Sequence, residues 1–137
     1  MKPVFNQQKC SVVLPFIDGV FFYFLLYVTL ISREIGSRRE AVLLPFESFG
    51  ILSGEFHYVI ENVLLFIPFG FLLYITCRAF GKKCNMKTIL LASLLTSVSV
   101  ESLQYIFSCG KSETDDVITN VVGAMIGYLI AKLKRVG

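Results

Sequence analysis

Three short stretches of this sequence place a carboxylate close to a carboxamide in otherwise apolar surroundings. They are Glu61 with Asn62, Glu101 with Gln104, and Asp116 with Asn120. Such groups can hold a polar ligand by hydrogen bonds, and carboxylates that lie near one another can shift their pKa values toward those that acid–base catalysis needs. Either kind of site requires elements that bring the three stretches together.

Composition indicates the solvent in which those elements fold. The chain has 137 residues, of which 55% are hydrophobic and 17% charged, and its mean hydropathy of +0.69 is too high for an ordinary soluble domain. A helix needs roughly 20 residues to cross the hydrocarbon layer of a membrane. Four apolar stretches come near that length, at residues 12–32, 58–80, 87–107 and 117–133. We predict an all-α integral membrane bundle of four transmembrane helices, with residues 1–137 forming a single domain.

The basic residues predict the orientation of this bundle. Nine Lys and Arg residues fall at the two chain ends and around the second connection, whereas four fall in the first and third connections. Because basic residues favour the cytoplasmic side, we expect a multi-pass protein of the cell membrane with both termini in the cytoplasm and an extracellular loop at residues 33–57. Lys and Arg do not gather with aromatic residues on one stripe, so we expect membrane lipids, and no nucleic acid, as partners.

Helical spacing brings the polar pairs to one depth near the outer surface. Glu101 lies six residues before Phe107, about 9 Å below the end of the third helix. Residues three or four apart share one face of a helix. This spacing forms a stripe of Ser93, Ser97, Glu101, Gln104 and Ser108, and a second series of Asp116, Asn120, Gly123 and Gly127. We expect the two glycines to pack against the stripe, or to join two copies as a homo-oligomer, and the polar groups to line a pocket open to the outside.

A structural role is the alternative for some of the acids. Glu61, Asp116 and Asp18 are each expected near the start of a helix, where the helix dipole favours a carboxylate; we assign Asp18 no function. Glu101 is expected near a helix end that disfavours a carboxylate, at a depth where an unpaired charge is costly. Glu101 therefore points most strongly to a functional site.

We expect neither a metal nor a cofactor. The spacing of Cys77 and Cys84 matches no zinc motif, and the single histidine, His57, is predicted on the opposite side of the membrane.

Several motifs resemble those of the VanZ-like family of small bacterial membrane proteins. The resemblance covers residues 39–130, and its motifs recur in order. They are Arg39 six residues before Pro45-Phe46, NVLLFIPFG at 62–70, ESLQ at 101–104 and DVITNVVGAMIG at 116–127. Many family members carry Arg where this chain has Lys111, and Lys keeps the charge but lacks the planar fork that grips an anion at two points.

Spacing and resemblance together give a set of candidate residues. We expect ligand binding by Arg39, Glu61, Asn62, Glu101, Gln104, Lys111, Asp116 and Asn120. We expect structural roles for Pro45, Phe46, Phe66, Pro68, Gly70, Gly123 and Gly127.

The resemblance implies low-level resistance of Gram-positive bacteria to teicoplanin and related lipoglycopeptide antibiotics. The first hypothesis is a non-enzymatic factor whose outer pocket binds a lipid-linked peptidoglycan precursor, a lipid or the antibiotic. The alternative is a small membrane enzyme that modifies a lipid-linked cell-envelope substrate, with Glu101 or Asp116 as general acid or base. It ranks second because no nucleophile is evident beside a base.

Overall fold

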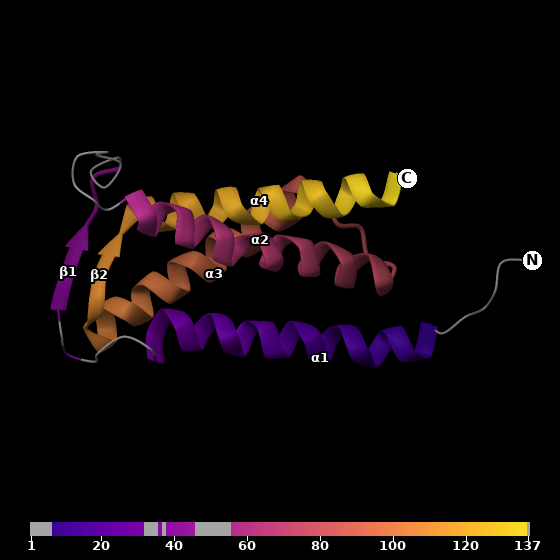
Figure 1. Cartoon of the computed structure of the whole chain (residues 1–137), viewed down its shortest axis with the longest axis horizontal. Coiled ribbons are helices and arrows are strands. Elements are labelled where there is room, and N and C mark those ends of the chain that lie inside the picture. Colours follow the sequence, from indigo (N-terminus) through magenta and orange to yellow (C-terminus); the bar gives the residue numbers. More distant parts are fainter. Residues whose placement is uncertain (1–6, 32–35, 37, 46–55, 137) are drawn as a thin grey trace, which may run out of the picture.

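The described residues of the chain fold into four long helices and one two-stranded sheet (Figure 1). The computed structural model describes residues 7–31, 36, 38–45 and 56–136. The elements are α1 (Gln7–Leu26), the π-helical turn η1 (Tyr27–Ile31), β1 (Arg38–Val42), α2 (Phe56–Ala79), α3 (Met86–Phe107), β2 (Cys109–Glu113) and α4 (Thr114–Val136). All four α-helices are long and apolar enough to cross a membrane. The predicted all-α membrane bundle is therefore confirmed.

Helices α2 and α4 run in the same direction and are packed closely together. A Cβ atom added to Gly70 would overlap the backbone of Ala124, and one added to Gly127 would overlap the backbone of Ile67. Small residues let helix backbones approach to this extent, and packing of this kind holds helices together in a bilayer. This pair is the rigid centre on which the other elements are placed.

The predicted partner of the glycine seam was wrong. Gly123 and Gly127 do not pack against the polar stripe of α3 but face α2, where a Cβ on Gly123 would overlap the carbonyl oxygen of Val63. The reason is that α2 carries its own glycine, Gly70, whereas α3 has none to allow an equally close approach. The seam is filled within the chain, so a homo-oligomer would need another surface.

A short parallel sheet lies at the end of the bundle where α2 and α4 begin (Figure 1). Strand β1 pairs with β2 from Arg38 opposite Cys109 to Val42 opposite Glu113. Ser108 ends α3 in a left-handed conformation with φ of 53°, which turns the chain directly into β2. The sequence of β2, CGKSE, lacks the alternation of apolar residues that predicts a strand, and the pairing arises from the neighbouring segment.

The helix starts differ from those predicted, with one consequence for a charged side chain. Helix α1 begins at Gln7, because polar residues before Val12 continue the helix beyond the apolar stretch. Asp18 therefore lies inside α1, so the prediction that it caps the helix was wrong. Its Oδ2 accepts a hydrogen bond of 2.6 Å from the Thr76 hydroxyl of α2.

The other residues for which the sequence predicted a structural role are buried in some cases and exposed in others. Phe66 is fully buried in the core, and α2 continues as a helix through Pro68. Pro45 lies in an exposed turn after β1, and Phe46 lies outside the described residues. Helix α1 lies along one side of the bundle and exposes large apolar side chains such as Phe16 and Tyr23, as suits a surface that faces lipid (Figure 1).

Candidate functional site

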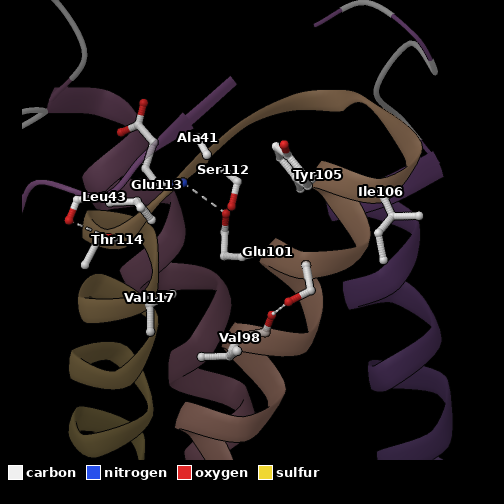
Figure 2. A pocket seen from close by; sticks show the side chains of 11 residues that line it. Ala41, Leu43, Val98, Glu101, Tyr105, Ile106, Ser112, Glu113, Thr114 and Val117 are labelled. Carbon is white, nitrogen blue, oxygen red and sulfur yellow. Dashed lines mark hydrogen bonds between the residues drawn. The ribbon is translucent and has the colours of Figure 1, made fainter. Parts of the chain in front are cut away.

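Glu101 is buried near the sheet end of α3. Its side chain is 7% exposed, and its Oε2 accepts a hydrogen bond of 3.2 Å from the backbone N–H of Glu113, the last residue of β2 (Figure 2). A carboxylate near the C-terminal end of a helix is not stabilised by the helix dipole. The N–H donor from β2 compensates for this missing stabilisation of the carboxylate. The buried Glu101 carboxylate and the position of β2 therefore stabilise each other.

The second acid is held between the two central helices. The Asn62 carboxamide of α2 donates a hydrogen bond of 2.7 Å to Oδ1 of Asp116 in the first turn of α4. Asp116 also lies where the helix dipole of α4 favours a negative charge. This contact joins the starts of α2 and α4, directly below the sheet.

Two buried carboxamides complete the polar interior. Gln104 Nε2 donates to the backbone carbonyl of Thr29 in η1 at 2.9 Å, and Asn120 Nδ2 donates to the Ser97 hydroxyl at 2.8 Å. Both carboxamides are at most 4% exposed, and their carbonyl oxygens have no hydrogen-bond partner among the described residues. Gln104 thereby attaches η1, which follows α1, to α3.

A pocket of about 470 Å³ lies beside Glu101, between α3, the start of α4 and the two strands (Figure 2). This volume falls within the usual range for small-molecule sites. Its lining consists of Ala41, Leu43, Val98, Glu101, Ser102, Tyr105, Ile106, Ser112, Glu113, Thr114 and Val117.

The pocket is mostly apolar, and its polar groups are spread along its length. Ser112 lies at the sheet end, whereas Val98 lies toward the middle of the bundle (Figure 2). The Ser102 hydroxyl lies beside Val98, to whose carbonyl it donates a hydrogen bond of 2.7 Å. Tyr105 and Ile106, which are 44% and 60% exposed, border the pocket on the flank of α3. The pocket is therefore open toward the surface that a membrane would cover.

Comparison with known proteins establishes the family. A model of the VanZ/LLP1 family matches residues 15–135. The chain belongs to the VanZ-like family. It is 35% identical over 112 residues to Protein VanZ of Enterococcus faecium, an alignment that covers 82% of this chain and 65% of that protein. No solved structure matches the chain. Family membership and the four apolar helices together make this VanZ-like chain a multi-pass membrane protein.

The structure brings most of the candidate ligand-binding residues to the sheet end of the VanZ-like bundle, in different roles. Among the candidates whose side chains the structure describes, Glu101 is the one that lines the pocket. The other polar residues of the interior bond to neighbouring helices; they are Asn62, Gln104, Asp116 and Asn120. Glu61 is exposed on α2 and does not join them.

The two basic candidates lie on the paired strands. Arg39 pairs with Gly110, and the next pair along the sheet is Glu40 with Lys111. Their backbones therefore run side by side next to the pocket, while their side chains lie outside the described part of the structure.

Several pocket residues were not predicted from the sequence. Tyr105 lies four residues after Glu101 on the same helix face, so helical spacing contained a signal for it. Ser112 and Glu113 belong to β2 and Thr114 directly follows it. The sequence of β2 shows no strand pattern, so the position of these residues near Glu101 was not predicted. Glu113 contributes through its backbone N–H, a group that every residue except proline has.

The arrangement is suited to hydrogen bonding more than to metal chemistry. Ser102, Tyr105 and Thr114 line the pocket together with Glu101, and the hydroxyls of Ser102 and Thr114 donate to the backbone carbonyls of Val98 and Leu43. In the part of the chain that the structure describes, no three His, Cys, Asp or Glu side chains gather as metal ligands. The site can form hydrogen bonds through Glu101 and can hold an apolar chain against its other walls.

Proposed function

We propose that this VanZ-like protein lowers susceptibility to teicoplanin and related lipoglycopeptides by binding a membrane amphiphile in the Glu101 pocket. The occupant is a lipid-linked cell-wall precursor, a lipid or the antibiotic itself, in that order of preference. The observation that carries the proposal is the buried carboxylate of Glu101 in the wall of a mostly apolar pocket on the flank of the bundle.

The pocket matches the two halves of such a molecule. Amide or hydroxyl groups of the ligand donate to Glu101, where hydrogen bonds are strengthened by the low polarity of the surroundings. Its apolar chain lies against Val98 and Val117 and continues into lipid. Binding by the protein lowers the amount of free ligand, so the antibiotic acts on less of its target. No chemical reaction is needed for this effect.

An enzymatic role is the second candidate, because hydroxyls of Ser102 and Ser112 line the same pocket as Glu101. Glu101 would then act as general base toward a hydroxyl or water. Among the described residues that line the pocket there is no His, Cys or Lys, so the usual pairs of nucleophile and base are not assembled there. Mass spectrometry of a lipid-linked precursor incubated with the protein in vesicles separates the two candidates, since binding alone leaves its mass unchanged.

The test replaces Glu101 by Gln in a teicoplanin-sensitive Gram-positive host. Gln keeps the size of the side chain and an oxygen that accepts from the Glu113 N–H, but it removes the charge. Loss of one charge-assisted hydrogen bond weakens binding by about tenfold. We expect the E101Q protein to reach the membrane in normal amounts and to give no protection against teicoplanin.

Glu61→Gln is the matched control, because it makes the same chemical change at an exposed position outside the pocket. It should leave the minimum inhibitory concentration of teicoplanin at the wild-type value. Equal loss of protection in E61Q and E101Q would remove the pocket from the explanation. Absence of protection by abundant wild-type protein would refute the proposed function itself.

A further inference from the structure

A second cleft lies between α1 and α2, away from the Glu101 pocket. It has a volume of about 340 Å³ and contains one charged side chain, Asp18, in an otherwise apolar lining. The other residues that line it are Gly19, Phe21, Phe22, Phe69, Leu72 and Leu73. Helix α1 and the glycine-rich pair of α2 and α4 therefore do not close completely over this region.

Only half of the Asp18 carboxylate has a partner. Oδ2 accepts the hydrogen bond from Thr76, whereas Oδ1 is buried and has no hydrogen-bond partner among the described residues. An ionisable group in a membrane-spanning helix is costly to keep and commonly marks a functional site. The Thr76 contact explains the position of the side chain but leaves one acceptor oxygen unused.

The cleft has a polar end and an apolar end. Thr76 lies three residues before the end of α2, about 4.5 Å of helix rise from the connection to α3. Phe69, Leu72 and Leu73 all precede Thr76 on α2, and Phe21 and Phe22 follow Asp18 on α1. Since the two helices run in opposite directions, the apolar residues all lie toward the bilayer centre from the Asp18–Thr76 pair.

The cleft is open toward the lipid side beside Gly19. A Cβ atom added to Gly19 would meet nothing within 4 Å, and Phe22 is 44% exposed. A ligand can therefore enter the cleft past Gly19 without a clash with the backbone of α1.

We propose that this cleft binds a membrane lipid with a primary ammonium head group. The ammonium group donates to Asp18 and lies near aromatic rings that favour a cation, and the acyl chain lies along the apolar walls. The site is separate from the one in the proposed function and does not depend on it.

The test uses delipidated protein, titrated with phosphatidylethanolamine or phosphatidylglycerol and analysed by native mass spectrometry. The wild type should prefer phosphatidylethanolamine by about tenfold, the effect of one charge-assisted hydrogen bond. Asp18→Asn, which can still accept from Thr76, should abolish the preference. Gly19→Leu, which fills the cleft, should remove binding of the lipid, and Glu101→Gln should leave it unchanged.

Thermal unfolding of each variant verifies that it is folded. An unchanged preference in folded D18N, or an equal loss in E101Q, would overturn the proposal. Dodecylamine, an amine without a lipid head group, tests whether the site takes a lipid or a free amine. Displacement of bound phosphatidylethanolamine by excess dodecylamine supports the site. Binding of dodecylamine to a protein that shows no preference for phosphatidylethanolamine would exclude the lipid as occupant.

Discussion

At the scale of single residues, Cys84 shows how position in the fold changes reactivity. Burial raises the pKa of its thiol from the ordinary value of 9.0 to about 11, and the neighbouring Cys77 acts in the same direction. The thiolate is the reactive form, and a pKa two units higher leaves about one hundredth as much of it near pH 8. We expect Cys84 to be alkylated by iodoacetamide about a hundredfold more slowly than an ordinary cysteine at pH 8, and the rate to keep rising up to about pH 11.

The measurement uses a chain whose other cysteines, Cys10, Cys77 and Cys109, are replaced by Ser. The pKa of Cys84 should still be raised there, because burial is the largest single cause and does not depend on Cys77. A chain with a single cysteine at position 83, made by Lys83→Cys with Cys84→Ser, is the control, since position 83 is exposed. The same dependence of rate on pH at the two positions would contradict the effect of burial.

For single residues, the sequence predicted the importance of the Glu101 charge but not the groups that surround it. Glu101 stood out because a carboxylate near the C-terminal end of a membrane helix is unfavourable unless something compensates for it. The compensation comes from a backbone N–H of β2. The residue types in a sequence do not indicate which backbone group makes such a contact. The position of Asp18 inside α1 was missed because the start of this helix could not be located among the polar residues at its beginning.

At the scale of elements, the four helices were predictable and the sheet was not. Length and hydropathy decide which segments cross a membrane, so those segments are visible in one sequence. Strands β1 and β2 are five residues each, lie far apart in the chain and are parallel, so their pairing depends on the helices between them. The packing of α2 on α4 was also missed. Residue spacing shows which face of α4 carries the glycines, but it does not show which other helix packs against that face.

The contact of α2 with α4 gives the prediction at this scale. Gly127→Ala adds a Cβ that overlaps the backbone of Ile67, a group that cannot move aside. We expect the free energy of unfolding to fall by about 1–3 kcal/mol, as for other overpacked cores. Helix propensity alone would give the opposite sign, since Ala is favoured over Gly by about 1 kcal/mol inside a helix. Unfolding of the purified protein by sodium dodecyl sulfate measures the difference.

Gly19→Ala is the control for this prediction. Its added Cβ meets nothing within 4 Å, so helix propensity should dominate and stability should be kept or raised. Similar stability changes in the two variants would mean that α2 and α4 are not as closely packed as described.

At the scale of the whole molecule, the Glu101 pocket and the Asp18 cleft lie in opposite halves of the bundle. The sheet and the Glu101 pocket lie where α1 and α3 end, whereas α1 begins and α4 ends at the other side, together with the α2–α3 connection (Figure 1). The exposed basic residues of that second end include Lys82, Lys83, Lys132 and Lys134. The preference of basic residues for the cytoplasm predicts that the Glu101 pocket faces the outer leaflet.

Single cysteines in a chain without its native cysteines test this orientation. A membrane-impermeant maleimide added to intact cells should label Leu44→Cys, which is exposed just after β1, and should not label Lys83→Cys. Both should be labelled once the cells are permeabilised, which shows that each thiol is accessible. The reverse pattern in intact cells would place Glu101 in the inner leaflet, beyond the reach of an antibiotic that acts from outside. The proposed protection would then have to act on a lipid-linked precursor before it crosses the membrane, and direct binding of the antibiotic would be excluded.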